Sequence, residues 1–255
     1  MGIIKSIPMG FKLFNCIRRY NPYLAKVQAL RDSGDVIKER ELIADATGKW
    51  VDEVIDIFDI EVNVEGRENI PMNEPCVFIC NHEGYGDIFV LFRALAGKQV
   101  GYVAKDALQK VPYFGKWIEM VRGVFIQRGD PRAALKSISA GVELIKQGFS
   151  LAIFPEGTRS RGPVMNEFKA GSFKLATKAK VPVVPISLNG TYHLFEETST
   201  IRKGAVIDIY IHPPIDTSSL DRHGTAMLPV TVENIIRSKF DELVKKEEER
   251  IKGGN

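Results

Sequence analysis

The fold of this chain is decided by residues 76–87, which read CVFICNHEGYGD. The apolar residues 76–80 are typical of a buried strand, and the glycine-containing segment after them leads into a predicted helix that begins at Asp87. His82 therefore lies five residues before Asp87 at a strand-to-helix junction. If the turn folds back, the carboxylate accepts the proton of one ring nitrogen and leaves the other nitrogen free as a base. The same two residues also fit a hydrogen-bonded turn histidine and an acid favoured by a helix N-terminus.

From residue 60 onward, short apolar runs alternate with helical segments. The predicted strands are residues 60–64, 76–80, 100–104, 124–127, 150–154, 183–188 and 206–211. The predicted helices between them are residues 87–96, 112–120, 131–146 and 171–180. This alternation predicts an α/β fold with a largely parallel mixed sheet that helices cover on both faces. Sites in such sheets lie beyond the carboxyl ends of the strands.

A second informative segment is residues 154–160, FPEGTRS, which follow a predicted strand and form a predicted tight turn. Arginine suits bidentate recognition of phosphate, and backbone N–H groups at such a turn add further donors. The segment therefore predicts an anion-binding turn, with a purely structural Glu–Arg pair as the alternative. Lys105 and Arg128 each follow a predicted strand as well. Because the carboxyl ends of parallel strands meet at one edge of a sheet, these cations favour a shared anion pocket.

The amino-terminal end is basic. The first 31 residues hold six lysines and arginines and no acid, so the rest of a chain with net charge +3 sums to −3. This asymmetry favours an anionic partner, either membrane lipid or nucleic acid. Residues 8–20 have apolar side chains at helical spacing beside cations, and Asn21-Pro22 is expected to end that helix. A short basic amphipathic helix is typical of an interfacial anchor, so we predict a phospholipid surface and no nucleic acid as partner. The alternative is a helix that packs on the core with its cations outside.

Two further helices flank the alternating region. Residues 32–58 read as an acidic amphipathic helix, and residues 231–252 read as an exposed helix with acid–lysine pairs four residues apart. The predicted pairs are Asp241 with Lys245, Glu242 with Lys246 and Glu248 with Lys252. We therefore predict two parts, an N-terminal helical membrane-associating segment over residues 1–58 and an α/β domain over residues 59–255.

The cysteine content and hydropathy bear on the cellular location. Three cysteines argue against a disulfide framework and for a reducing compartment. No run of about eighteen apolar residues predicts a bilayer-spanning helix, and no convincing secretory signal is present. We expect a peripheral or monotopic protein on the cytoplasmic face of the cell membrane.

The usual nucleophile signatures are missing. The sequence has no Gly-x-Ser-x-Gly elbow and no cysteine with an evident activating partner. With none of these signatures, we expect a reaction without a covalent enzyme intermediate. Cys76, Cys80 and His82 would lie on one strand face, but donors crowded on one strand match tetrahedral zinc poorly, and we expect no metal.

Four segments occur in the order found in one known family. They are residues 81–87, 123–128, 154–160 and 181–186. With them the chain resembles the lysophosphatidic acid acyltransferase family, the 1-acylglycerol-3-phosphate O-acyltransferases, over roughly residues 74–190. The resemblance implies a glycerolphosphate-acyltransferase-like fold.

The resemblance also implies roles for individual residues. His82 would be the general base and Asp87 its orienting partner. The residues of the acceptor site would be Lys105, Arg128, Glu156, Gly157, Thr158 and Arg159. The acyl donor would be a thioester of coenzyme A or acyl carrier protein, used as co-substrate with no cofactor, and the product would be phosphatidic acid. Gly84 departs from the serine common in the family, which bears on substrate preference.

Three alternative functions stay open at this level. The first keeps the transferase reaction but takes glycerol 3-phosphate or another lysophospholipid as acceptor. Water replacing the alcohol would make the protein a thioester hydrolase. A module without catalytic activity that binds anionic lipid through its arginines is the third.

Overall fold

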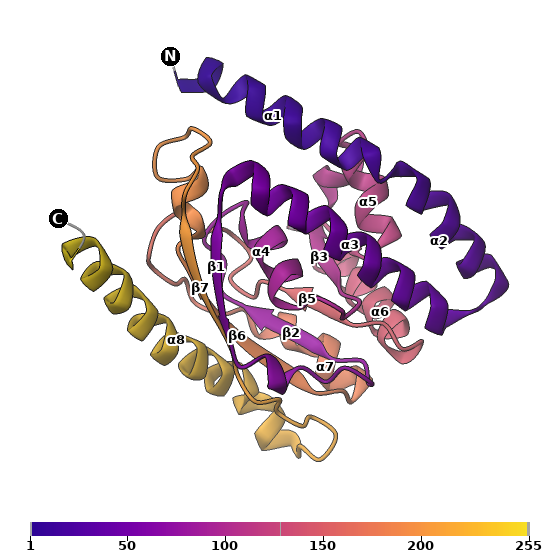
Figure 1. Ribbon diagram of the computed structural model, residues 1–255. Coiled ribbons are helices and arrows are strands. Elements are labelled where there is room, and N and C mark those ends of the chain that lie inside the picture. The colour runs from indigo at the N-terminus through magenta and orange to yellow at the C-terminus, as the bar shows by residue number, and fades with distance from the viewer. Residues whose placement is uncertain (1, 128, 254–255) are drawn as a thin grey trace.

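The computed structural model describes residues 2–127 and 129–253 of the chain (Figure 1). Its strands form one seven-stranded sheet in the order β1-β7-β6-β2-β5-β3-β4. They are β1 (Glu61–Glu65), β2 (Val77–Cys80), β3 (Gly101–Lys105), β4 (Val124–Ile126), β5 (Leu151–Ile153), β6 (Val183–Asn189) and β7 (Val206–Ile211). Neighbouring strands pair in parallel except β6 with β7, so the predicted largely parallel mixed sheet is confirmed.

Helices cover both faces of this sheet, as predicted. The α-helices are α1 (Gly2–Arg19), α2 (Asn21–Ser33), α3 (Val36–Phe58), α4 (Asp87–Ala94), α5 (Phe114–Met120), α6 (Pro131–Lys146), α7 (Lys174–Ala179) and α8 (Arg222–Gly253). Short 3-10 turns are η1 (Arg67–Asn69), η2 (Asp106–Lys110), η3 (Ala170–Phe173) and η4 (Thr191–Leu194). Figure 1 shows α1, α2 and α3 on one side of the sheet and α8 on the other.

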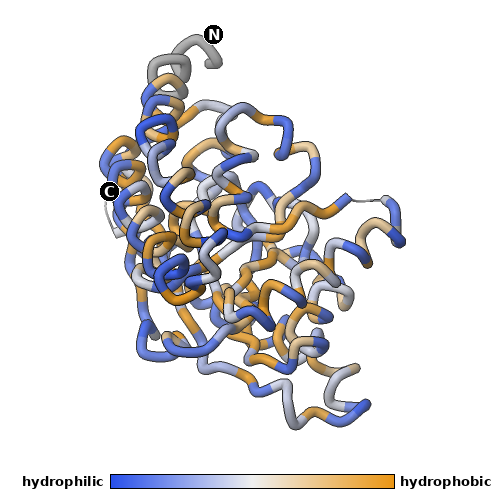
Figure 2. The backbone as a smooth tube through the Cα atoms, turned by 90° about the vertical axis from the view of Figure 1, so that its right-hand side faces the viewer, coloured by the Kyte–Doolittle hydropathy of each residue, from blue (hydrophilic) through white to orange (hydrophobic). Residues whose placement is uncertain are grey.

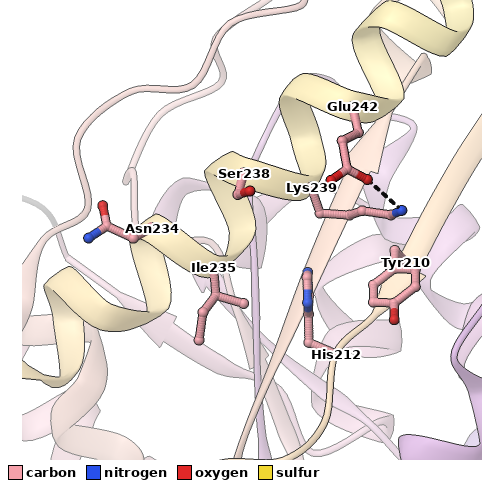
Figure 3. A pocket seen from close by; sticks show the side chains of 7 residues that line it. All are labelled: Tyr210, His212, Asn234, Ile235, Ser238, Lys239 and Glu242. Carbon is pink, nitrogen blue, oxygen red and sulfur yellow. Dashed lines mark hydrogen bonds and ion pairs between the residues drawn. The ribbon is translucent and has the colours of Figure 1, made fainter.

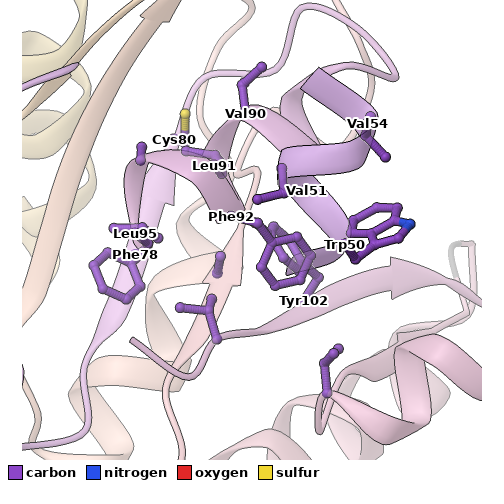
Figure 4. Packing of buried hydrophobic residues seen from close by; sticks show 14 of the residues in the cluster. Trp50, Val51, Val54, Phe78, Cys80, Val90, Leu91, Phe92, Leu95 and Tyr102 are labelled. Atoms are coloured by element: carbon purple, nitrogen blue, oxygen red, sulfur yellow. The ribbon is translucent and has the colours of Figure 1, made fainter. Parts of the chain in front are cut away.

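The core consists of two layers because the strands bury side chains on both faces. Phe78 of β2 points into a cluster with helices α1 to α5, whereas its neighbours Val77 and Ile79 point into a cluster with α6, α7 and α8. Successive side chains of a strand alternate between faces, so one buried strand serves both layers. Figure 4 shows part of the first layer, where Trp50 of α3 and Phe92 of α4 pack together with apolar side chains of the sheet. In Figure 2, hydrophobic segments run through the middle of the molecule.

The amino-terminal helices differ from the prediction in their boundaries. The predicted helix over 8–20 is α1, which spans Gly2–Arg19 and ends just before Asn21-Pro22 as expected, and a second helix, α2, begins at Asn21. Pro22 lies in the first turn of α2, where its missing N–H has no helical partner to lose. The predicted helix over 32–58 is divided at Gly34, whose φ of +73° is left-handed and favours glycine. Asp35 then accepts a hydrogen bond from the Lys38 N–H and starts α3.

These helices share the first core layer with the sheet. Cys16, Tyr20 and Val27 are buried in the same cluster as the inner residues of β2 and β7. The alternative interpretation of α1, a helix packed on the core, therefore holds for its inner side, while its outer side exposes Phe11 and Phe14. Among the described residues, the helices include none that is both long enough and apolar enough to cross a bilayer.

The carboxyl-terminal helix is longer and more buried than predicted. α8 begins at Arg222 rather than Thr231, and Leu228, Val232 and Ile236 insert into the second core layer. The predicted pair of Glu248 with Lys252 is present at 3.5 Å. Lys246 instead pairs with Asp208 of β7 at 2.9 Å, and Glu242 pairs with Lys239 at 2.8 Å. The pairing of Glu242 with Lys246 that their spacing predicted is therefore wrong, because the buried carboxylate of Asp208 on the sheet pairs with this lysine instead.

The other predicted elements are present with small shifts at their ends. The predicted helix 131–146 matches α6 in both bounds, with Asp130 capping its first turn through the Arg132 and Ala133 N–H groups. The predicted helix 171–180 is split into η3 and α7.

Candidate active site

The histidine–aspartate pair predicted from the sequence is formed. β2 ends at Cys80 and α4 begins at Asp87, so the six intervening residues make a tight loop at the carboxyl end of the sheet. His82 Nδ1 lies 2.5 Å from Asp87 Oδ2. Asp87 is fully buried, whereas the His82 side chain is 15% exposed. One ring nitrogen therefore contacts the acid, and the ring retains an accessible edge at which Nε2 has no hydrogen bond to a described residue.

The buried carboxylate of Asp87 also organises the loop itself. Its Oδ2 accepts hydrogen bonds from the backbone N–H of Glu83 at 2.9 Å and of Gly84 at 3.2 Å. Asn81 fixes the start of the loop, because its side-chain amide exchanges two hydrogen bonds with the backbone of Leu188 in β6. A buried carboxylate is stabilised by such donors, which also hold it in one orientation. The loop therefore presents the acid to the imidazole in a fixed geometry.

The aromatic rings of Phe154 and Tyr102 fix the plane of the imidazole. The His82 ring stacks on Phe154 with a centroid distance of 4.1 Å and an interplanar angle of 15°. Tyr102 lies behind Phe154 at 6.3 Å and nearly parallel to it. The ring is thus held between an acid at one nitrogen and an apolar face, which restricts its rotation.

The turn after β5 is joined directly to the histidine loop. β2 and β5 are adjacent and parallel, with Ile79 opposite Ile153, so their following loops leave the same edge of the sheet. The Ser160 N–H donates to the His82 carbonyl at 2.8 Å, and the Arg161 N–H donates to the Glu83 carbonyl at 3.1 Å. The two motifs found in the sequence therefore form one site.

Glu156 supplies the third connection between these loops. Its Oε1 accepts the His82 N–H at 2.6 Å, and its Oε2 accepts the backbone N–H and the side-chain amide of Asn166, each at 2.8 Å. Burial raises the pKa of this carboxyl group above its ordinary value. Both oxygens are occupied, so in the structure Glu156 fixes the turn relative to the histidine. Its predicted contact with substrate stays a prediction.

Arg159 is already paired. Its Nη1 lies 2.6 Å from Glu196 Oε1, and its guanidinium lies 3.6 Å above the centre of the Tyr85 ring. The Tyr85 N–H donates to the same Glu196 oxygen at 3.0 Å. The predicted phosphate-binding arginine thus contacts a carboxylate and an aromatic face close to the dyad.

The remaining predicted residues lie at the same edge or outside the described region. Gly157 has a φ of +70°, and a Cβ there would lie 2.6 Å from Lys169 Nζ, so the turn brings a lysine that the sequence did not single out close to its backbone. Thr158 is exposed. Lys105 is exposed at the end of β3, the parallel neighbour of β5. Arg128 lies outside the described residues.

Two residues that the sequence did not reveal, Glu83 and Thr191, lie next to the dyad. The Thr191 hydroxyl donates a short hydrogen bond to Asp87 Oδ1 and lies 3.2 Å from Glu83 Oε2. That Glu83 oxygen also accepts the backbone N–H groups of Gly190 and Thr191, each at 2.9 Å. Glu83 is fully buried, and burial together with the nearby Asp87 raises its pKa well above the ordinary value. The only signal available in the sequence was Glu83, an acid directly after the histidine. Thr191 gives no local signal, because it is 104 residues from Asp87.

A groove of about 530 Å³ lies elsewhere, between α8 and β7 (Figure 3). Because β7 runs antiparallel to β6, His212 after its end lies at the sheet edge opposite to His82. Burial lowers the pKa of His212 to about 4, and its Nε2 lies 2.8 Å from the Ser187 hydroxyl. The groove therefore belongs to the packing of α8 and contributes nothing to the dyad.

The raised pKa of Glu83 predicts a stability difference that depends on pH. A group whose pKa is raised by folding stabilises the fold fully below its unfolded value, here 4.5, and this contribution is lost as pH rises through the folded value. Glu83→Gln cannot lose a proton. We expect its unfolding temperature, relative to the unmodified protein, to rise as the pH increases above 4.5, because only the unmodified protein then gains a proton on folding. Thermal unfolding measures this, with exposed Glu167→Gln as the control; a difference independent of pH for Glu83→Gln would contradict it.

Comparisons with known proteins agree with this geometry. A family model described as acyltransferase matches residues 61–189. The chain is 35% identical to a chloroplastic 1-acyl-sn-glycerol-3-phosphate acyltransferase of Brassica napus, over 63% of this chain and 47% of that protein. It is 31% identical to the 1-acyl-sn-glycerol-3-phosphate acyltransferase of Borreliella burgdorferi, over 73% of this chain and 72% of that protein. The chain spans about half the length of the chloroplastic relatives that it matches.

A solved structure has the same fold as this chain. The crystal structure of the 1-acyl-sn-glycerophosphate acyltransferase from Thermotoga maritima is similar to this chain with a TM-score of 0.77 and 27% sequence identity, covering 95% of this chain and 98% of that one. The resemblance inferred from four ordered segments is thereby confirmed. This chain belongs to the acyltransferase family whose curated members include the 1-acyl-sn-glycerol-3-phosphate acyltransferases.

Proposed function

We propose that this protein transfers a fatty acyl group from a thioester to the free hydroxyl of lysophosphatidic acid, giving phosphatidic acid. The proposal rests chiefly on one observation, the 2.5 Å contact of His82 Nδ1 with the buried Asp87. Such a pair supplies an oriented general base, and the turn that carries Arg159 is hydrogen-bonded to the same loop.

His82 acts as base through its second nitrogen. Nε2 accepts the proton of the acceptor hydroxyl while that oxygen attacks the thioester carbonyl carbon, which becomes tetrahedral. Collapse of this intermediate breaks the carbon–sulfur bond, and the imidazolium returns its proton to the departing sulfur. Asp87 stabilises the imidazolium and keeps the proton of the neutral ring on Nδ1. The acyl group passes directly from donor to acceptor.

Direct transfer fits the state of the cysteines. Cys76 and Cys80 are buried in the sheet, and burial raises the pKa of Cys76 to about 11 and that of Cys80 well above its ordinary value. Burial likewise raises the pKa of Cys16 to about 12. Protonated, buried thiols are poor nucleophiles, so none of the three is suited to carry the acyl group.

The acceptor's phosphate is proposed to bind at the turn after β5. Arg159 lies there, Lys169 approaches Gly157, and Lys105 is the last residue of the neighbouring strand β3. A guanidinium and lysines at one sheet edge attract a phosphate, which places the attached glycerol hydroxyl beside His82. We propose coenzyme A or acyl carrier protein as the carrier of the donor.

The enzyme is proposed to work at the cytoplasmic face of the cell membrane as a peripheral or monotopic protein. Phe11 and Phe14 of α1 are exposed, and Phe14 contacts Tyr113, which precedes α5, at a ring distance of 5.1 Å. Lys12 and Arg18 are exposed on the same helix. An apolar patch beside cations, here Phe11, Phe14 and Tyr113, suits the interface of an anionic bilayer.

The reaction is tested with purified protein, an acyl-CoA and a thiol reagent. We expect thiol release that requires lysophosphatidic acid and falls at least about a hundredfold in His82→Ala, because the base is lost. The exposed His223→Ala is the matched control and should retain full activity.

The other outcomes of this assay identify the alternatives. Release without an acceptor indicates a hydrolase, and release that requires glycerol 3-phosphate or another lysophospholipid changes the substrate. No release in either case indicates a lipid-binding module. Normal turnover by His82→Ala would contradict the proposed base.

Membrane attachment has a separate test. Phe11→Ser combined with Phe14→Ser should reduce sedimentation with phosphatidylglycerol vesicles by about tenfold or more, because two exposed aromatic side chains no longer enter the interface. Ile37→Ser is the control, since this α3 residue is 69% exposed but lies outside the patch. Unchanged sedimentation of the double variant would argue against the patch.

A further inference from the structure

The space beside Gly84 is filled by another side chain. A Cβ at residue 84 would lie 2.5 Å from Glu196 Oε2 and 3.0 Å from Glu196 Cδ. A serine at position 84 therefore could not coexist with Glu196 in its present place. The glycine at position 84 thus leaves the space that the Glu196 carboxylate occupies.

Glu196 contacts Arg159 much as an acceptor phosphate would. Its Oε1 lies 2.6 Å from Arg159 Nη1, in a pair whose side chains are 20% exposed for the arginine and 2% exposed for the glutamate. Carboxylates and phosphates bind guanidinium groups through the same kind of charge-assisted hydrogen bonds. The carboxylate therefore occupies an anion position on Arg159 within the site.

Within the part of the chain that the structure describes, the Glu196 carboxylate makes hydrogen bonds through only one of its two oxygens, so another anion can take its place on Arg159. Only Oε1 of Glu196 has hydrogen bonds, from Arg159 and from the Tyr85 N–H, while Oε2 is buried without a partner among the described residues. A buried carboxylate oxygen without a donor is unfavourable. Glu196 also lies in the irregular segment between η4 and β7 rather than in the sheet.

We propose that Glu196 competes with the acceptor phosphate for Arg159. An acceptor must displace this carboxylate before its phosphate binds the guanidinium. The displacement costs every acceptor the same free energy, so Glu196 lowers the affinity of all anions that bind Arg159 by one factor. The inference rests on the proposed function only in placing the acceptor phosphate at Arg159.

The test measures binding directly. Inorganic phosphate is titrated into the intact protein by calorimetry, and its dissociation constant is compared among variants. Glu196→Gln keeps the size and the acceptor oxygen but removes the charge, so phosphate should bind about tenfold more tightly. Glu197→Gln is the control, because this neighbour pairs with His193 and Arg202 rather than with Arg159. Equal or weaker phosphate binding by Glu196→Gln would overturn the proposal.

A second variant displaces the Glu196 carboxylate by a substitution at residue 84. Gly84→Ser places a side chain where Glu196 Oε2 now lies, which should push the carboxylate from Arg159 and tighten phosphate binding in the same direction. Gly84 has no positive φ, so serine can adopt its backbone conformation. Phosphate binding unchanged by this substitution would count against competition for Arg159.

Arg159→Gln separates this inference from the proposed function. If it weakens phosphate binding while Glu196→Gln does not strengthen it, the phosphate site stands and the competition is wrong. If Arg159→Gln leaves phosphate binding unchanged, the acceptor site and the competition are both wrong. Turnover gives a second readout. The kcat/KM for lysophosphatidic acid should rise several-fold in Glu196→Gln, because the acceptor no longer displaces a carboxylate, and an unchanged or lower value would contradict the competition.

Discussion

The site depends on the carboxylate of Asp87, which is buried in the loop between β2 and α4. Such a charge is costly to bury unless donors surround it. The loop supplies the N–H groups of Glu83 and Gly84, and Thr191 adds its hydroxyl. His82 Nδ1 completes this shell at 2.5 Å. The interaction that stabilises the buried acid therefore also orients the imidazole, so the fold of the loop and the geometry of the base have one cause.

The order of the strands brings the other parts of the site to this acid. β6, β2 and β5 are adjacent, and both neighbours run parallel to β2, so the loops after all three leave the same edge of the sheet. The loop after β2 carries the dyad, the segment after β6 carries Thr191, and the turn after β5 carries Arg159. Hydrogen bonds between the loops then fix their separation, as with Ser160 on the His82 carbonyl. Groups held on a rigid sheet edge need little rearrangement for reaction.

The sequence predicted the parts of this structure that depend on local patterns. Alternating apolar runs predicted the parallel sheet, and the spacing of His82 and Asp87 predicted their contact across one tight loop. It did not reveal Thr191 or Glu196, because the contacts of these residues with the dyad loop join segments more than a hundred residues apart. The pairing of Lys246 with Asp208 was missed because it joins a helix to a strand 38 residues away. Gly34, in the left-handed conformation, ends α2, so the helix predicted from residue 32 begins only at Val36. Tertiary partners thus decide where charges are paired.

The account's central claim is that Asp87 holds the proton of the neutral imidazole on Nδ1 and leaves Nε2 as the base. Nitrogen-15 NMR of His82, at a pH where the ring is neutral, distinguishes the two tautomers directly. The structure predicts a protonated Nδ1 and an unprotonated Nε2, and Asp87→Asn should reduce this preference. A neutral ring that carries its proton on Nε2 would contradict the account.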